Sequence, residues 1–259
     1  MYTLYVCIMY IYEPGQQLEI QKHICRYGYV IVNVISPKRA SLFLKQLQQF
    51  VKGMGVSESI GLIKSHGIGQ SDVLWKIRRV RTIKNVFATL CNCKPMHLLP
   101  SFDGAYYMGN QTCQNGYTLW PHRDQRPTNN NVDTFQGSVC LSESDGGFIC
   151  WPKSHLIDDW DVTGVTDVDY FTVPLDSHHL ITQKNAKKIC PPPGSLIIWD
   201  SRLIHCNFPP TQIFPRAVAF VCMVDGRDAS EEVMQKREFC MENNMTTSHH
   251  PIRFRINDE

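Results

Sequence analysis

Apolar residues recur at helical spacing through most of the first hundred residues. Their pattern predicts a helix over residues 16–26, a second helix from 37 to about 52, and a third over 71–90. Between the first two, a β-branched run over 29–35 predicts a strand. We therefore expect this part of the chain to be mostly helical, with one early strand.

The pattern changes after Pro100 to short apolar runs separated by Gly, Pro, Asn and Asp. These runs predict strands at residues 116–120, 134–141, 147–151, 194–199 and 217–224. Many short strands of this kind favour a β-barrel or a β-sandwich. The polar stretch between His155 and Pro191 fits no regular element and is interpreted as a lid or an insertion.

The length and composition are those of an ordinary globular protein. The chain has 259 residues, of which 43% are hydrophobic and 19% charged, and no repeat or linker interrupts it. We expect a single domain, residues 1–259, of mainly β class with flanking helices. Its predicted parts are a helical N-terminal support at 16–95, a β core at about 100–225 and a C-terminal helix or tail at 226–259.

Charge and cysteine content restrict the partners and the compartment. A net charge of +2 produces no field that would favour a polyanion, so no nucleic-acid partner is expected. The eleven cysteines form no Cys-x-x-Cys pair, which disfavours zinc and disulfides and favours a reducing, cytoplasmic compartment. The apolar start, residues 2–12, is too short to span a bilayer and lacks a cleavage site, so no membrane association is expected.

Residues 122–129 match the catalytic loop of protein kinases, His-Arg-Asp followed by Asn at the fifth position after Asp. A phosphotransferase also needs a glycine-rich loop, a lysine-bearing strand and an Asp-Phe-Gly motif. Gly53-x-Gly55 lies too close to Lys64 for that loop and strand, and Asp145-Gly-Gly147 is a poor substitute for the last motif. A kinase-like function is therefore the weaker alternative.

The same motif also supplies two ligands of a metal site. In a facial triad, two histidines and one carboxylate hold Fe(II), and alternate residues of a strand such as His122 and Asp124 point to the same side. The spacing alone is weak evidence, because 10 histidines and 24 acidic residues give about one such triplet by chance. A surface pair is the default interpretation unless further residues complete the site.

Two residues further along the chain would complete the metal site. The apolar run 194–204 ends at His205, which would be the third ligand, and Arg216 opens the next strand. A planar guanidinium is suited to a bidentate pair with a carboxylate. Singly, each residue is better explained as structural, but their order after His122-x-Asp124 favours a site.

These residues resemble the Fe(II)/2-oxoglutarate oxygenase superfamily and, within it, the phytanoyl-CoA dioxygenase-like family. The resemblance covers about half the chain, residues 101–224. It is carried by Ser-Phe-Asp-Gly at 101–104, Trp-Pro-His-Arg-Asp-Gln at 120–125, Phe-Gln-Gly at 135–137, the string 145–155 that ends in Pro-Lys-Ser-His, the run 199–205, and Arg216. Lys153 stands where the family commonly has glycine.

The resemblance implies a double-stranded β-helix, the jelly-roll or cupin-like fold, with iron at its open end. It implies hydroxylation of a small organic substrate with 2-oxoglutarate and dioxygen, releasing succinate and CO2. His122, Asp124 and His205 would be the catalytic metal ligands, and Arg216 would hold the cosubstrate's distal carboxylate. Asn207 and Gln136 are weaker candidates for cosubstrate binding. The substrate and the oligomeric state are not predicted.

Three further expectations concern the function and the residues outside the predicted site. The barrel fold can persist without chemistry, so a catalytically inactive binding protein is the third hypothesis. Three tryptophans near the motifs, Trp120, Trp151 and Trp199, are interpreted as core residues rather than a substrate cage. The pairs His178-His179 and His249-His250 are assigned no metal.

Overall fold

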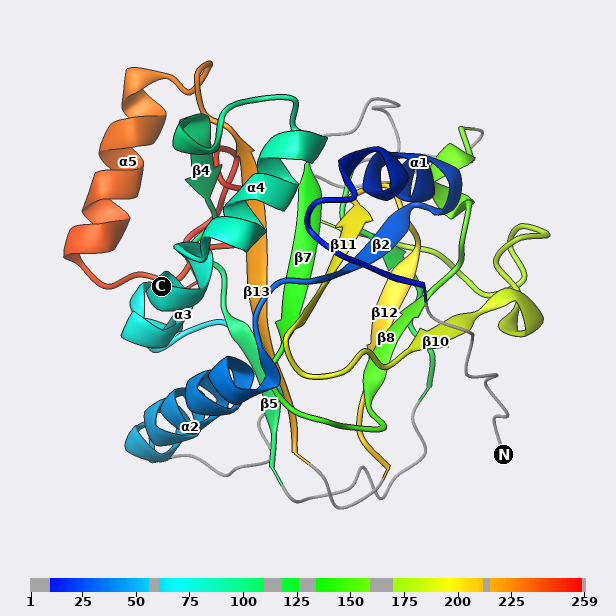
Figure 1. Ribbon diagram of the computed structural model, residues 1–259, viewed down its shortest axis with the longest axis horizontal. Coiled ribbons are helices and arrows are strands. Elements are labelled where there is room, and N and C mark those ends of the chain that lie inside the picture. Colours follow the sequence, from blue (N-terminus) through cyan, green and yellow to red (C-terminus); the bar gives the residue numbers. More distant parts are fainter. Residues whose placement is uncertain are drawn as a thin grey trace.

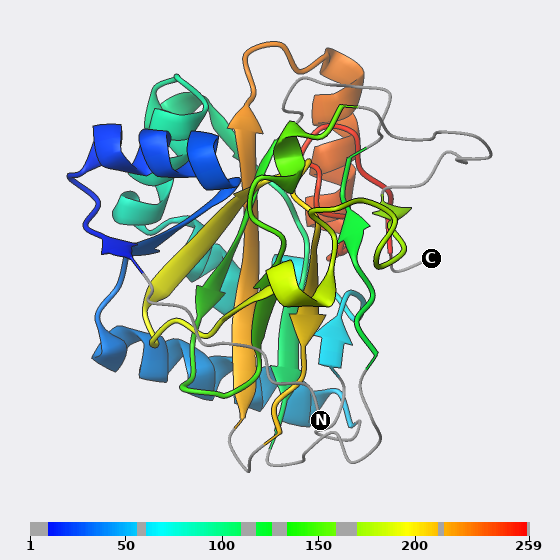
Figure 2. The same cartoon turned by 90° about the vertical axis from the view of Figure 1, so that its right-hand side faces the viewer.

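The computed structural model shows two β-sheets facing each other, with helices packed on the outer side of the larger sheet (Figure 1). It describes residues 10–55, 61–109, 118–125, 134–158, 170–211 and 215–257. A view turned by 90° shows the two sheets as separate layers (Figure 2).

The larger sheet contains eight strands. Along it lie β1 (Ile11–Tyr12), β2 (Tyr29–Asn33), β11 (Ser195–Asp200), β7 (Phe135–Cys140), β13 (Arg216–Asp225), β5 (Ala105–Met108) and β3 (Gly61–Ile63), and β4 (Leu98–Pro100) also pairs with β13. Only the β1–β2 pair in this sheet is parallel. The smaller sheet contains β10 (Lys187–Ile189), β8 (Gly147–Cys150), β12 (His205–Phe208), β6 (His122–Arg123) and β9 (Phe171–Thr172), in that order.

The chain alternates between the sheets as it advances. Strands β5, β7, β11 and β13 lie in the larger sheet, and β6, β8, β10 and β12 lie in the smaller one. Two antiparallel sheets wound in this way form a jelly roll. The prediction of a double-stranded β-helix flanked by helices is confirmed, although the sheets do not close into a continuous barrel.

The described residues form five α-helices: α1 (Gln17–Tyr27), α2 (Pro37–Gly53), α3 (Asp72–Arg78), α4 (Arg81–Leu90) and α5 (Glu231–Glu242). Helix α2 begins as predicted, because the Ser36 hydroxyl accepts a hydrogen bond from the Arg39 amide and Pro37 occupies the first turn. Short 3-10 helices are η1 (Ile68–Gln70), η2 (Pro95–His97), η3 (Ser154–Leu156) and η4 (Gln183–Asn185).

The single helix predicted over residues 71–90 is wrong, because the chain breaks it at Val80. Val80 has an extended backbone and lies between α3 and α4. In an unbroken helix, six residues separate Ile77 from Ile83, which would place them about 120° apart around the axis. Both are fully buried in the same core, so the break brings both apolar faces toward the sheet.

Strand β13 shows how the sequence separates core from site. Its alternate residues Ala217, Ala219 and Val221 belong to the large hydrophobic cluster beneath the helices. Because side chains alternate along a strand, Arg216 and Val218 face the other sheet. The space between the two sheets is therefore where the predicted site residues are directed.

Lys153 has a left-handed backbone, φ 73°, at the turn where the resemblance led us to expect glycine. A side chain in this conformation lowers the free energy of unfolding by about 1–2 kcal/mol. Glycine avoids that cost, but its greater freedom in the unfolded chain lowers the free energy of unfolding by about 0.5–1 kcal/mol. We expect Lys153→Gly to raise the free energy of unfolding by about 0.5–1 kcal/mol, measured by denaturant titration. The same substitution at the half-buried Lys187 of β10 should lower the free energy of unfolding. A loss of stability in Lys153→Gly would contradict the argument.

The nine cysteines within the described residues are all free thiols. In the same part of the chain, no helix combines the length and the apolar character required to cross a bilayer.

Candidate metal centre

The two histidines of the proposed triad face each other across a pair of strands. Strand β12 pairs with β6 in antiparallel register, and His205 lies directly opposite His122. Their ring centroids are 4.4 Å apart. Asp124 follows His122 by two residues, so alternation along the chain brings its carboxylate to the same side. Pairing of the strands thus joins residues that are 83 positions apart in the sequence.

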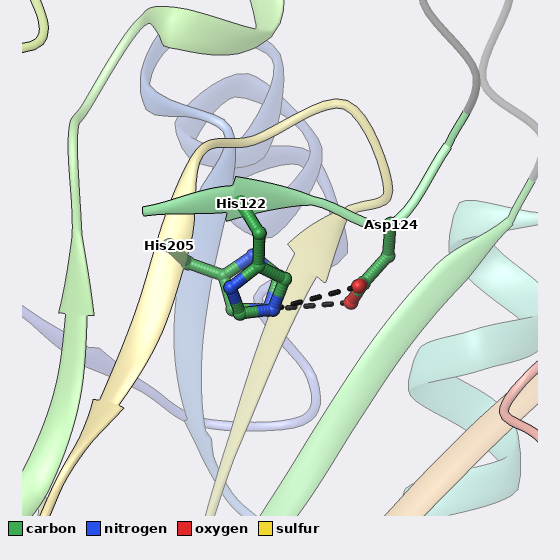
Figure 3. Close-up of side chains that lie close together, drawn as sticks. All are labelled: His122, Asp124 and His205. Atoms are coloured by element: carbon green, nitrogen blue, oxygen red, sulfur yellow. Dashed lines mark ion pairs between the residues drawn. The ribbon is translucent and has the colours of Figure 1, made fainter. Parts of the chain in front are cut away.

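The three side chains converge on one point (Figure 3). The Nε2 atom of His122 lies 3.5 Å from Oδ1 of Asp124, and Nε2 of His205 lies 3.3 Å from Oδ2 of the same carboxylate. One ligand atom from each residue falls within 4.8 Å of the others. His122 and His205 are buried, and Asp124 is half-buried.

The other nitrogen of each ring fixes its orientation. Nδ1 of His122 lies 3.2 Å from the Trp120 carbonyl oxygen, and Nδ1 of His205 lies 3.0 Å from the Leu203 carbonyl oxygen. A carbonyl only accepts, so each Nδ1 donates its proton to it, and in the neutral ring this leaves the Nε2 lone pair available to a metal. Two lone pairs then face a carboxylate at 3.3–3.5 Å, an arrangement that a cation between them stabilises. The donor set therefore fits a metal ion.

Electrostatics favour the same protonation states. Burial, with a smaller contribution from His205, lowers the pKa of His122 to about 4. Burial acts to raise the pKa of Asp124, but His205 and His122 outweigh it and hold that pKa well below its ordinary value. At neutral pH the carboxylate is ionised and the His122 ring is neutral, which are the forms that bind metals.

Arg216 lies between the sheets with its charge uncompensated. Only 5% of its surface is exposed, and its guanidinium lies over the Tyr106 ring at 4.4 Å. Nη2 donates a 2.9 Å hydrogen bond to Oδ1 of Asn207, while the buried Nη1 has no hydrogen-bond partner among the described residues. No carboxylate among the described residues forms an ion pair with it. A buried cation with a free donor favours an anionic ligand.

A small cavity of about 20 Å³ adjoins Arg216. Its walls come from both sheets and include Ser138, Cys140, Ser142, Gly147, Phe148 and Ile197. Asn207, which holds Arg216, is two residues from His205 on the same strand, a separation of about 7 Å. Asn207 thus links the Arg216 side chain to the strand that carries His205.

Gln136 also faces the space between the sheets. It lies on β7 two residues before Ser138, and alternation directs both side chains to the same face. Its buried Nε2 has no hydrogen-bond partner in the part of the chain that the structure describes. An unpaired buried amide is costly, so this group is a candidate donor to a bound molecule. Its role in cosubstrate binding stays a prediction, as does that of Asn207.

The sheet-rich architecture does not support the kinase alternative. His122 and Arg123 form a short β-strand, and the Arg123 side chain is buried. Asn129, the other residue of that motif, lies outside the described residues.

Sequence reasoning was wrong about one tryptophan. Trp151 and Trp199 are buried as expected, but Trp120 is 43% exposed and its ring stacks on His122 at 4.2 Å with an interplanar angle of 6°. Tyr170, which the sequence did not single out, is 49% exposed and lies edge-on to His122 at 6.1 Å. The signal that was available is the position of Trp120, two residues before a metal ligand.

Proteins of known structure share this jelly-roll fold. No family model matches the chain. The chain is 24% identical over 264 residues to "Ava biosynthesis cluster protein O" of Aspergillus versicolor, covering 88% of this chain and 84% of that protein.

Three solved structures illustrate the likeness in fold. The epimerase SnoN in complex with Fe3+, alpha ketoglutarate and nogalamycin RO has a TM-score of 0.63 and 16% identity, covering 82% of this chain and 84% of its own. The alpha ketoglutarate-dependent carbocyclase SnoK has a TM-score of 0.56 and 15% identity, covering 85% and 89%. The hypothetical protein JW0805 from Escherichia coli has a TM-score of 0.69 and 14% identity, covering 97% and 79%.

Proposed function

We propose that this protein is a non-haem Fe(II)- and 2-oxoglutarate-dependent oxygenase acting on a small organic molecule. The observation that carries the proposal is the convergence of His122, Asp124 and His205 on one point with both Nε2 lone pairs directed at it. The uncompensated guanidinium of Arg216 supports it from the other end of the site. The similar fold of enzymes described as alpha ketoglutarate-dependent supports the choice of cosubstrate.

His122, Asp124 and His205 would hold the iron on one side and leave its remaining positions free for ligands. When bound, the ferrous ion and 2-oxoglutarate supply the activation of dioxygen that the side chains themselves do not perform. The protein's own contribution is to position these groups. The two backbone carbonyls fix the histidine rings, and Asn207 fixes Arg216 for the distal carboxylate.

Hydroxylation is the proposed outcome, by the resemblance to the phytanoyl-CoA dioxygenase-like family. Similar folds host an epimerase and a carbocyclase, so the fold alone does not select the product. Orientation of the substrate relative to the metal decides which bond reacts. A catalytically inactive binding protein is less favoured, because the triad and Arg216 are all in place.

The direct test is turnover of 2-oxoglutarate without any added substrate. Protein purified under nitrogen, then given Fe(II), 2-oxoglutarate and oxygen, is expected to release succinate and CO2 slowly, measured by chromatography and by label from 1-¹⁴C-2-oxoglutarate. The Zn(II)-loaded protein is the control, because zinc has no redox chemistry. Equal succinate formation by both metal forms, or none by the iron form, would contradict the proposal.

A further inference from the structure

Two aromatic side chains flank the metal ligand His122 and remain open to solvent. Trp120 lies parallel to the His122 ring, and Tyr170 is edge-on to it. Trp120 precedes β6 by two residues, and Tyr170 directly precedes β9, which pairs with β6 through His122 and Thr172. Strand pairing therefore places both rings at the same ligand.

Their exposure distinguishes them from the other aromatics near the site. Trp199 and Phe148 also contact a metal ligand, His205, at 5.1 and 5.2 Å, but both are buried in the core between the sheets. Trp120 is 43% and Tyr170 49% exposed. Large apolar side chains grouped at the surface mark binding sites more often than they serve stability.

The geometry of Trp120 indicates what it binds. One face of the indole is covered by the His122 ring, so the exposed area belongs to the opposite face and the edges. A flat aromatic surface contributes most to binding when another ring stacks on it, because stacking adds to the burial of apolar area. A saturated ring system of the same size buries similar area but lacks the stacking contribution.

We propose that Trp120 and Tyr170 form the binding platform for the substrate that is oxidised, and that this substrate carries a planar aromatic ring system. The inference rests on the proposed function, since it places the substrate beside the metal that His122 would hold. The platform binds the ring, and the remainder of the molecule extends past the His122 ring toward the metal centre.

The test uses two probes with the same ten-carbon skeleton, 2-naphthol and decahydro-2-naphthol. Protein loaded with Co(II) and 2-oxoglutarate is titrated with each, and paramagnetic relaxation of the probe protons is compared with the Zn(II)-loaded protein. We expect relaxation enhancement for 2-naphthol and an apparent Kd at least fivefold lower than for the saturated probe. Equal Kd values, or no enhancement for 2-naphthol, would overturn the inference. Stronger binding of choline than of 2-naphthol would also overturn it, in favour of a cationic substrate.

Variants connect the preference to the platform. Trp120→Leu and Tyr170→Leu should each raise the Kd for 2-naphthol, Trp120→Leu by roughly tenfold, and leave the Kd for decahydro-2-naphthol within about twofold. Phe239→Leu removes an equally exposed aromatic ring from α5 and should change neither Kd. If the Trp120→Leu variant still prefers 2-naphthol, the assignment of Trp120 to the substrate platform is wrong.

Failure of this inference is separable from failure of the proposed function. Binding of Co(II) and 2-oxoglutarate to the unmodified protein is measured first, by the visible absorption of cobalt. If they bind and the probes show no preference, only the aromatic substrate is wrong. If neither binds, the proposed metal centre is wrong as well, and the platform has no function beside it.

Discussion

Replacement of His122, Asp124 or His205 by alanine is expected to abolish ferrous iron binding and, with it, succinate formation. Loss of a group that only orients a metal ligand costs about 10–100-fold in affinity, so loss of a ligand itself should exceed 100-fold. Each residue supplies one of three ligand atoms that lie within 4.8 Å of one another, and none of the three is redundant within the described residues. Calorimetric titration with Fe(II) under nitrogen measures the affinity, and trapped CO2 measures turnover.

The matched control for these variants is His179→Ala. His179 is an exposed histidine whose ring contacts only that of His178 among the described aromatics. Its removal should leave the iron affinity and the stoichiometry of one ion per chain unchanged. Melting curves of the metal-free proteins separate loss of a ligand from loss of the fold. Full affinity in His122→Ala, with normal melting, would exclude this metal centre.

The larger strands were predictable because burial of one or both of their faces shapes their sequences, whereas the jelly-roll class was implied by the resemblance to the oxygenase superfamily. In β13, small and apolar residues that face the helices alternate with residues that face the site, beginning with Arg216. In β11 the run is apolar on both faces, because Leu196 and Ile198 pack under the helices while Ile197 and Trp199 pack between the sheets. Burial of one face of a strand gives an alternating pattern, and burial of both faces gives a continuous apolar run.

The strand that carries the candidate ligand His122 was placed wrongly. The apolar run at residues 116–120 predicted a strand, but residues 118–120 are not in one, and β6 consists of His122 and Arg123. Two polar residues have no strand signal of their own. Their extended conformation comes from pairing with β12 and β9, which are distant in the sequence. The direction of His122 was predicted from its spacing to Asp124, whereas its register with His205 was not.

Close packing requires glycine at both glycine positions of Asp145-Gly146-Gly147, which the sequence alone did not show. A Cβ at Gly146 would lie 2.5 Å from Cδ of Arg216 and 2.7 Å from the Pro210 amide nitrogen. A Cβ at Gly147 would lie 2.5 Å from the Ile189 carbonyl oxygen. Gly146 thus gives the Arg216 side chain room, and Gly147 allows β8 to lie close to β10. Close approach between segments 70 positions apart is invisible to local sequence patterns.

Arg216→Gln is expected to raise the KM for 2-oxoglutarate by a factor of about 30 to several thousand. Removal of one partner from a buried, hydrogen-bonded charge pair costs about 2–5 kcal/mol, and each 1.4 kcal/mol is tenfold in affinity. The free Nη1 of Arg216 is the donor that glutamine cannot replace, since its amide is shorter and uncharged. Initial rates of succinate formation across 2-oxoglutarate concentrations give KM and kcat separately.

The KM values and iron affinities of further variants show whether lost carboxylate binding causes the rise in KM. Arg216→Lys keeps the charge but not the planar fork that donates to Asn207 and to a carboxylate, so its KM should lie between those of Arg216→Gln and the unmodified protein. Iron affinity measured without 2-oxoglutarate should be the same in all three, because Arg216 is not a ligand. Arg227→Gln, on the surface and paired with Asp225, should leave KM unchanged. An unchanged KM in Arg216→Gln would show that the buried guanidinium serves the fold and that the cosubstrate's distal carboxylate binds elsewhere.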